Sequence, residues 1–432
     1  MKSDEILNVA TKRGFFFPSG EIHGAKAGFW TYGHLGTVMK RKFEDLWRDY
    51  FLKLNDNYFE IDDVNILSEE VFKRSGHLKH FTDPLEEKGK VKQFNMMIDV
   101  NVGVTGDEKM YLRPETAQSP YIAFKREFMA LRERLPLGLA IIGKAFRNEI
   151  NPRQGLFRLR EFTQAELQIF FDGENLDVNF NEIKNYKLKI MSKNIKCSTL
   201  KLPKFYIYHL AKIQQFYLEV LKIPIDKFRL REIKGKEKAF YNKIHYDFEF
   251  KMDSLGGWKE IGGLHYRTDY DTKNHGIGIN YNGKKIFPHV LELSFGVDRN
   301  IWGLMDIFYK KEKNRSLFLF NKNITPVEVA VFPLVNKDKI PEKAKEVYDL
   351  IKNEFNVFYD SKGSIGKMYR RMDEVGCTAM LTIDHDSLKN NDVTLRDRDS
   401  MKQIRIKVSD LKEVLEKFFD GVELKKLGKL VR

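Results

Sequence analysis

The feature that most constrains the fold is a pair of predicted strands, between about residues 139 and 169, with charged side chains where a core strand carries apolar ones. Successive side chains of a strand point to opposite faces. Counting by twos puts these residues on one face of each strand: Ile141, Gly143, Ala145, Arg147 and Glu149, then Arg158, Arg160, Phe162, Gln164 and Glu166. The intervening Asn151-Pro152-Arg153-Gln154-Gly155 is a turn signal. We therefore predict an antiparallel hairpin.

Such a hairpin would present arginines, an aromatic ring and carboxylates on one sheet surface. A solvated face with incidental ion pairs is the usual explanation for charges on strands. Here apolar runs flank the charged residues, so we predict that the hairpin is central and that its charges are enclosed. A surface of this kind suits a phosphate, a purine ring and an ammonium group.

The composition describes a folded chain with a polyanionic partner. A chain of 432 residues with 42% hydrophobic and 31% charged residues is typical of a globular protein of two or three domains. No apolar run approaches bilayer length and the N-terminus lacks a signal-peptide pattern, so we expect no membrane association. The two cysteines, Cys197 and Cys377, favour a reducing cytoplasm. The net charge of +14 favours a polyanion, although genomic bias toward lysine would also produce it.

Hydrophobic periodicity divides the chain into two predicted parts. In the first part we predict a helix over 36–54, strands over 58–61 and 94–104, and a helix from Glu115 to about Leu135. Residues of about 172–250 have the character of an insertion. A strand over 258–268, a turn at Asn282-Gly283 and a strand over 290–295 precede a helix near Asp298.

The lysine- and asparagine-rich stretch 310–323 is the predicted linker. Beyond it, strands over 327–334, 357–359 and 379–383 alternate with helices over 342–355 and 364–375. Two short basic strands and a last helix follow. This alternation predicts a compact α/β domain.

Two motifs connect the chain to a known family. The run FRNE (146–149), a loop and RLREF (158–162) resemble the second signature motif of class II aminoacyl-tRNA synthetases. The continuation FTQAE (162–166) and the octapeptide YLRPETAQ (111–118) resemble glycyl-tRNA synthetases of the dimeric, archaeal and eukaryotic-like type. The resemblance covers about residues 13–415. It implies an α+β catalytic domain on a mixed, mainly antiparallel sheet over 1–320, with the insertion, and an α/β anticodon-binding domain over 325–432.

The resemblance implies ATP-dependent attachment of glycine to tRNA(Gly) through an adenylate. Catalysis of this kind requires bent, neutralised phosphates, a clamped adenine and an in-line carboxylate, and it needs no protein nucleophile. Ser294 lacks the elbow of a nucleophilic serine. Arg147, Glu149 and Arg299 are the predicted catalytic residues, and Phe162 is the predicted adenine platform. The remaining predicted ATP contacts are Asn148, Phe157, Arg158, Glu260, Ile261, Gly296 and Asp298. Glu260 and Glu292 are predicted Mg²⁺ ligands.

For glycine, the resemblance places Glu115, Glu166 and Ser294 around the ammonium and Arg267 at the carboxylate, with Gln164 and Glu292 beside them. Taken singly, each acid has a simpler explanation as a helix cap or a surface ion pair. Because glycine has no side chain to bind, selectivity requires a tightly held ammonium and no free volume at the α-carbon. Adding or removing one methylene in a pocket changes binding by only about 1–3 kcal/mol, so rigid polar walls are needed.

The chain departs from the family pattern in three places. Residues 83–93 form a shorter segment than the arginine-containing linker of the relatives, so that substrate contact has no equivalent. No proline of the first, dimer-forming motif follows Trp47. The third motif reads Gly296-Val297-Asp298-Arg299, with aspartate where many members have glutamate. A homodimer is therefore expected by analogy alone.

The C-terminal residues from about 325 to 420 resemble the anticodon-binding domain of the glycine, histidine, proline and threonine enzymes, through 363–376 and 393–403. Basic residues at helical and strand spacing suit backbone contacts and readout of unstacked bases. The predicted tRNA contacts are Lys367, Arg370, Arg371, Arg396, Arg398 and Lys402. A solvated helix face is the alternative for each of them.

Two other functions compete with this reading. The first is a catalytically inactive synthetase-like subunit that binds nucleic acid, such as the accessory subunit of mitochondrial DNA polymerase. Loss of the charged hairpin would mark it, and Arg147, Glu149, Phe162 and Arg299 are all present. The second is a class II synthetase for another small amino acid, against which YLRPETAQ argues.

Overall fold

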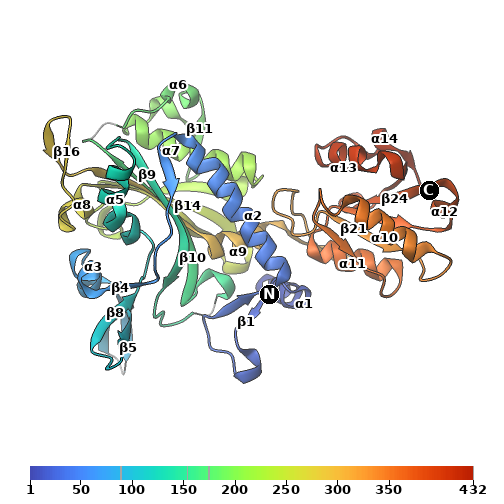
Figure 1. The fold of residues 1–432 in the computed structure, drawn as a ribbon, viewed down its shortest axis with the longest axis horizontal. Coiled ribbons are helices and arrows are strands. Elements are labelled where there is room, and N and C mark those ends of the chain that lie inside the picture. Colours follow the sequence, from blue (N-terminus) through green and yellow to red (C-terminus); the bar gives the residue numbers. More distant parts are fainter. Residues whose placement is uncertain (88–89, 153, 174–175, 432) are drawn as a thin grey trace. The chain divides into compact units, whose positions relative to one another are not determined.

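The structure is a computed structural model that describes residues 1–87, 90–152, 154–173 and 176–431. Its contacts form two compact units (Figure 1). The sheet unit comprises Pro18–Thr31 and Phe43–Gly303, and the terminal unit comprises Met1–Phe17, Tyr32–Lys42 and Leu304–Arg432. Arg153 of the predicted turn lies outside the described residues. Among the described helices, none is long and apolar enough to cross a membrane.

A nine-stranded sheet forms the centre of the sheet unit. In sheet order its strands are β12 (Lys193–Lys196), β11 (Lys187–Ile190), β13 (Phe228–Glu232), β14 (Ile244–Met252), β15 (Gly257–Thr268), β18 (His289–Gly296), β10 (Glu161–Phe171), β9 (Leu137–Phe146) and β3 (Tyr58–Glu60). The pairs β3–β9 and β11–β13 are parallel, and the other neighbours are antiparallel. The predicted mixed, mainly antiparallel sheet is confirmed.

The charged hairpin is the pair β9 and β10 near the middle of this sheet. Phe162 lies opposite Ala145, Gln164 opposite Gly143 and Glu166 opposite Ile141, so the predicted common face is confirmed. The strands themselves stop at Phe146 and Glu161. Arg147, Glu149, Arg158 and Arg160 therefore come from the connecting segment, which contains a 3₁₀ turn at Gly155–Phe157.

Aromatic side chains fill the core behind the hairpin. Phe295 of β18 lies 4.9 Å, centroid to centroid, from both Phe51 and Phe248, and α5 (Gln118–Ala130) packs Phe124 4.2 Å from Phe170 of β10. All five rings are fully buried. A buried aromatic side chain removes about 150–250 Å² from water, so this layer fixes the strands that carry the charged face.

Smaller helices and strands make up much of the rest of the sheet unit. They are β2 (Trp30–Tyr32), α3 (Glu69–Arg74), α4 (His77–His80), α6 (Phe180–Ile183), α7 (Lys204–Gln215), α8 (Tyr270–Asn274) and the strands β4 (Ile66–Ser68), β5 (Thr82–Glu87), β6 (Lys90–Asn95), β7 (Ile98–Val102), β8 (Glu108–Leu112), β16 (Ile279–Tyr281) and β17 (Lys284–Ile286). Asn282 and Gly283 both have positive φ between β16 and β17, which confirms the predicted tight turn. Helix α2 (His34–Phe51) confirms the predicted first helix.

Two predicted elements are shorter than expected. Glu115 does not open a helix, because the backbone around it is already bonded elsewhere: Phe146 N–H donates to the Arg113 carbonyl and Thr116 N–H donates to Gln164 Oε1. Helix α5 begins three residues later and ends at Ala130, before two residues with positive φ. The strand predicted over 94–104 is divided into β6 and β7, where Met97 N–H donates to Asn95 Oδ1.

The stretch of about 172–250 is not a separate module. It supplies β11, β12, β13 and β14, which are four strands of the same sheet. Tyr217 from this stretch lies 5.1 Å from Phe250 and 6.1 Å from Phe295, inside the common core. Its polar, lysine-rich sequence hid the strands because only one face of each is apolar.

The terminal unit contains a six-stranded sheet in the order β22–β21–β23–β24–β25–β26. Its elements are β21 (Val329–Pro333), α10 (Ile340–Ile351), β22 (Val357–Tyr359), α11 (Ile365–Val375), β23 (Ala379–Ile383), α12 (His385–Asn390), β24 (Asp392–Asp397), β25 (Gln403–Lys407), α13 (Leu411–Phe419), α14 (Leu424–Leu427) and β26 (Lys429–Leu430). β21, β22 and β23 are parallel, and the others pair antiparallel. The predicted α/β character is confirmed.

The predicted linker at 310–323 is wrong. This stretch forms the hairpin β19 (Tyr309–Lys311) and β20 (Ser316–Phe318), after α9 (Val297–Phe308). The Phe318 ring stacks on Phe320 at 4.8 Å and meets Phe15 at 5.7 Å, between α1 (Lys2–Arg13) and β1 (Phe16–Pro18). Tyr309, Leu317, Phe318 and Phe320 are buried in the terminal unit, while Lys310, Lys311 and Lys313 are exposed.

Candidate functional site

A cavity of about 230 Å³ opens on the charged face of the nine-stranded sheet. Strands β10, β15 and β18, the 3₁₀ turn and the start of α9 line it. Every residue predicted for ATP or glycine lines it except Asn148. These are Glu115, Arg147, Glu149, Phe157, Arg158, Phe162, Gln164, Glu166, Glu260, Ile261, Arg267, Glu292, Ser294, Gly296, Asp298 and Arg299.

One end of the cavity is lined by acids. Glu166 on β10 lies opposite Ser294 on β18, and Ser294 Oγ donates to Glu166 Oε1 at 2.7 Å. Gln164 Nε2 donates to the same oxygen at 2.9 Å, while its Oε1 accepts the Thr116 N–H. Gln164 thus ties the segment that carries Glu115 to β10. Glu115 Oε1 accepts a bond from Gln118 and lies 3.3 Å from His77 Nε2.

The acids at this end have perturbed pKa values. Burial and the neighbouring carboxylates Glu292 and Glu115 raise the pKa of Glu166 to about 8. Burial also raises the pKa of Glu292, although the Arg267 charge opposes this. Burial would raise the pKa of Glu115 too, but His77 and Arg267 hold it well below its usual range. The acid end therefore gathers buried carboxyl groups whose ionised form an ammonium group would stabilise.

Arg267 on β15 borders the acid end. Its guanidinium binds Asp271 of α8 through Nε and a terminal nitrogen, at 2.6 and 2.9 Å, and donates to Glu292 Oε2 at 3.1 Å. Tyr121 hydroxyl donates to the same Glu292 oxygen at 3.0 Å. The Tyr241 ring lies 4.3 Å from the guanidinium carbon. Asp271 thus fixes the Arg267 guanidinium, and the Tyr241 ring packs against it.

The opposite end of the cavity is lined by arginines and aromatic rings. The Arg147 guanidinium lies between the rings of Phe81 and Phe162, at 5.2 and 5.1 Å, and its Nε donates to the Pro114 carbonyl. Burial and the nearby Arg299 lower the pKa of Arg147. Arg299 lies 5.1 Å from the Phe157 ring and 3.2 Å from Glu260 Oε1. Two guanidinium groups in one enclosed space attract phosphate oxygens.

Other predicted residues support this end. Arg158 Nε donates to Glu149 Oε2 at 2.6 Å, and the Asp298 carboxylate accepts the Thr163 N–H of β10. The Asn148 N–H donates to the Met96 carbonyl, which explains its place outside the cavity lining. Arg160, assigned to the charged face, donates instead to the Glu149 and Ala27 carbonyls and holds the connecting segment.

The structure adds residues that the sequence did not identify. Tyr241 and His265 line the cavity, and His77 and Tyr121 contact its acids. His265 lies opposite Glu292 on the neighbouring strand, a relation that requires the register. A signal did exist for Tyr241, because Phe240-Tyr241 interrupts a run of lysines at 234–243.

The described residues of the cavity do not form a metal-binding site by themselves. In the described parts of the chain, no group of three His, Cys, Asp or Glu side chains is arranged for a metal ion. Glu292 lies opposite His265, five residues from Glu260 along β15, which is roughly 16 Å in a strand. The two carboxylates therefore cannot share one ion. Arg267 and Tyr121 both donate to Glu292 Oε2, and its role as a Mg²⁺ ligand stays a prediction.

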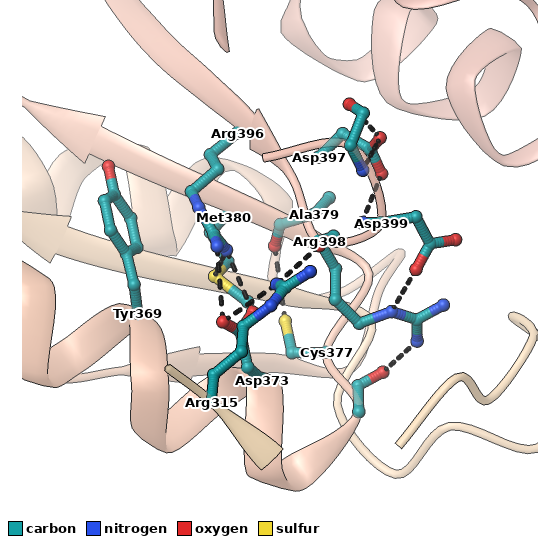
Figure 2. A network of polar contacts seen from close by, with 12 residues as sticks. Arg315, Tyr369, Asp373, Cys377, Ala379, Met380, Arg396, Asp397, Arg398 and Asp399 are labelled. Carbon is teal, nitrogen blue, oxygen red and sulfur yellow. Dashed lines mark hydrogen bonds and ion pairs between the residues drawn. The ribbon is translucent and has the colours of Figure 1, made fainter. Parts of the chain in front are cut away.

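In the terminal unit, Arg396 and Arg398, two of the predicted tRNA contacts, are buried in a network of polar contacts (Figure 2). Arg396 is 5% exposed and donates both terminal nitrogens to Asp373 of α11, at 2.9 and 3.2 Å. Arg315 also donates to Asp373, and Arg398 donates to the Phe320 and Gly376 carbonyls. The sequence showed basic residues on strands, and the structure turns them inward onto a buried acid.

The helix residues of the predicted tRNA set differ among themselves. Arg371 is bonded to Asp360 and to the Lys362 carbonyl. Lys367 and Arg370 of α11 and Lys402 are exposed, and none of the three forms an ion pair within the described ranges. These three remain available to an external anion.

Comparison with known proteins places this fold and cavity in a class. Residues 101–308 match the family "tRNA synthetase class II core domain (G, H, P, S and T)", and residues 328–418 match the family "Anticodon binding domain". A crystal structure of prolyl-tRNA synthetase from Cryptosporidium parvum, complexed with L-proline and AMP, matches with a TM-score of 0.70 at 14% identity. It covers 97% of this chain and 76% of that one. The fold is that of a class II aminoacyl-tRNA synthetase.

Curated relatives identify the family within this class. The chain is 30% identical to the glycine–tRNA ligase of Aeropyrum pernix over 99% of both chains, 31% identical to that of Pyrococcus horikoshii and 32% identical to that of Borrelia hermsii. The last two cover 97% and 95% of this chain, and 99% and 96% of the relatives. This chain belongs to the glycine–tRNA ligase family. The alignment with the Aeropyrum protein runs over 577 positions, so that relative has segments absent from these 432 residues.

Proposed function

We propose that this protein attaches glycine to tRNA(Gly) in two steps within the cavity. A glycine carboxylate oxygen attacks the α-phosphorus of ATP and pyrophosphate leaves. A ribose hydroxyl at the 3′ end of the tRNA then attacks the carbonyl carbon, and AMP leaves. The observation that carries the proposal is the division of one cavity into an acid end and an arginine end. A zwitterionic amino acid and a triphosphate fit these two ends.

The acid end is the proposed glycine site. Glu166, Ser294 and Glu115 bind the ammonium, and Arg267 faces the carboxylate. These side chains are locked by bonds to Gln164, Gln118 and Asp271, so the wall is rigid. An added methyl group at the α-carbon would break hydrogen bonds and strand buried charge, which costs more than a methyl contact gains.

The arginine end is the proposed ATP site. Arg147 and Arg299 neutralise the phosphates, and charge developing on the α-phosphate falls between them. The Arg147 guanidinium now covers one face of the Phe162 ring. Adenine stacking on Phe162 therefore uses the other face or displaces Arg147. Glu149 orients Arg158 beside this site.

Mg²⁺ would bind this site together with the nucleotide, which would supply part of its ligands. Mg²⁺ commonly uses one or two carboxylates with substrate phosphates and water, so a three-residue cage is not required. The half-exposed Glu260 carboxylate at the arginine end suits that role, and it would exchange its bond to Arg299 for the ion. When bound, the ion would neutralise phosphate charge.

The remaining assignments follow from the family. The catalytic domain is proposed over about 1–320 and the anticodon-binding domain over 325–432; the matched ranges 101–308 and 328–418 lie within them. Lys367, Arg370 and Lys402 are the proposed tRNA contacts. A homodimer in the cytoplasm is the proposed state, and both cysteines are free and buried, as a reducing compartment favours.

Glycine-dependent exchange of pyrophosphate into ATP tests the proposal. Exchange with glycine and its absence with alanine or serine is the expected result. Exchange with another amino acid would reassign the substrate. No exchange with any amino acid, together with tRNA binding, would favour the inactive nucleic-acid-binding subunit.

A further inference from the structure

A group of aromatic rings lies beside the acid end of the cavity. Tyr241 and Tyr270 stack with centroids 5.7 Å apart and ring planes 28° apart. The Phe240 ring meets Tyr270 edge-on at 5.4 Å and contacts His80 of α4 at 6.4 Å. Phe240 is nevertheless 73% exposed. We name Phe240, Tyr241 and Tyr270 the aromatic platform.

The aromatic platform is joined directly to the proposed carboxylate site. Tyr241 lines the cavity, and its ring covers the Arg267 guanidinium at 4.3 Å. Phe240 is the preceding residue, so its Cα is about 3.8 Å from that of Tyr241. On its other side, α4 carries both His80, against Phe240, and His77, against Glu115. The exposed Phe240 ring is therefore one residue from the cavity lining, on the side of Arg267.

The surroundings of the platform are basic. The loop 234–243 reads KGKEKAFYNK and contains four lysines. Its one acid, Glu237, is paired with Arg231 at 2.8 Å. Lys79 and Lys236 are exposed and take part in no ion pair within the described stretches of chain. An exposed ring beside lysines without an ion-pair partner is a combination that binds single-stranded nucleic acid, with a base on the ring and phosphates on the lysines.

We propose that the aromatic platform stacks the unpaired bases at the 3′ end of the acceptor tRNA, while Lys79 and Lys236 contact its phosphates. The inference rests on the proposed function, because the terminal ribose has to reach the glycyl carbonyl beside Arg267. A buried core role does not account for Phe240, since most of its ring faces water. If the platform only covered bound glycine, its loss would impair adenylate formation. Pyrophosphate exchange measures that step separately from tRNA charging.

The test compares Phe240→Ala, Phe240→Trp and the unaltered full chain in two assays. We expect Phe240→Ala to lower kcat/KM for tRNA(Gly) by roughly 5- to 150-fold, the equivalent of one lost base–aromatic stack, and to leave glycine-dependent pyrophosphate exchange within about twofold. Phe240→Trp keeps a stacking face and retains charging. The matched control is Phe59→Ala, an exposed phenylalanine on β3 at the far edge of the same sheet, which changes neither assay.

A spectroscopic readout isolates the stacking itself. In tRNA(Gly) carrying 2-aminopurine in place of the 3′-terminal adenine, binding to the unaltered chain or to Phe240→Trp quenches the fluorescence, and binding to Phe240→Ala does not. Unchanged charging by Phe240→Ala, or equal loss of exchange and charging, overturns the platform. If the unaltered chain shows no glycine-dependent exchange, the proposed function itself fails. That result differs from the two results that contradict the platform, because both of those require an active unaltered chain.

Discussion

The two units treat buried charge on neighbouring elements in opposite ways. In the terminal unit, Asp373 is 1% exposed and receives bonds from Arg315 and Arg396, and Arg315 also pairs with Glu312, so two acids meet two guanidinium groups. In the sheet unit, Glu115, Glu166 and Glu292 gather at one end of a cavity, and the nearest guanidinium is already shared with Asp271. Both regions carried similar signals in the sequence. Only the sheet unit has more acids than cations to pair with them.

This difference separates a structural network from a binding site. A balanced buried network is costly to break, because removing one partner strands the other. An unbalanced one raises pKa values and is relieved by a ligand of opposite charge. Loss of an acid should therefore damage stability in the terminal unit and substrate affinity in the sheet unit.

The largest expected effect is that of Asp373→Ala. The buried Arg396 guanidinium loses its carboxylate and Arg315 keeps only Glu312, and breaking a buried pair costs about 3–5 kcal/mol. We expect faster hydrogen–deuterium exchange in β23 and β24 by mass spectrometry, with glycine-dependent pyrophosphate exchange retained. Asp386→Asn, at an exposed acid of α12, is the control. Unchanged protection in Asp373→Ala would show that the network contributes little.

The second effect concerns Glu166→Gln and Glu115→Gln. Each removes a charge proposed to hold the ammonium, and a bond to a charged group contributes about 1.5–3 kcal/mol, so we expect the glycine KM to rise roughly 10- to 150-fold. The ATP KM should change far less. Steady-state exchange kinetics measure both constants. Equal changes in the two would refute the assignment, and Glu161→Gln, at the half-exposed start of β10, is the control.

Stability should respond to Glu166→Gln with the opposite sign from Asp373→Ala. The folded-state pKa of Glu166 is about 8, above the ordinary value of 4.5, so this carboxyl destabilises the fold increasingly as the pH rises between those values. A neutral amide removes that cost. We expect an unfolding free energy at pH 8 that is equal to or higher than that of the unaltered chain, measured by urea unfolding. A marked loss of unfolding free energy in Glu166→Gln would show that Glu166 stabilises the fold, as Asp373 does.

A smaller effect is the pH dependence of glycine binding. The raised pKa of Glu166 means that the free protein carries a proton there at pH 6 and 7, and ammonium binding favours the ionised form. The glycine KM should therefore fall as the pH rises from 6 to 8, by up to about tenfold per unit, because one pKa unit is a tenfold population change. Glu166→Gln should flatten this profile. A flat profile in the unaltered chain would contradict the mechanism.

The smallest effect distinguishes exposed from buried arginines in the terminal unit. Arg370→Ala removes one proposed phosphate contact, so we expect a several-fold rise in the KM for tRNA(Gly) and a salt dependence shallower by about one unit of slope. Exchange without tRNA should not change. Lys389→Ala, at an exposed lysine of α12, is the control. A steeper or unchanged salt dependence of tRNA binding would contradict the assignment of Arg370 as a tRNA contact.

Local sequence patterns predicted much of the fold. The alternation along β9 and β10 gave the face that carries Phe162, Gln164 and Glu166, and the register confirms it. Patterning failed where backbone groups bond at long range, as at Glu115, whose neighbours bond to β9 and β10 instead of forming a helical turn. It failed again at 310–323, where lysines concealed a hairpin whose apolar residues Leu317 and Phe318 are buried.

The sequence by itself determined which charged and aromatic residues this protein brings to its sheet, because side-chain alternation and the family motifs are local properties of the chain. The tertiary structure alone decided which of those charges remain unpaired. Arg396 and Glu166 are both charged strand residues, and one meets a buried counterion while the other meets more acids. That outcome depends on Coulomb interactions between residues far apart in sequence, which only the packed strands and helices bring within reach.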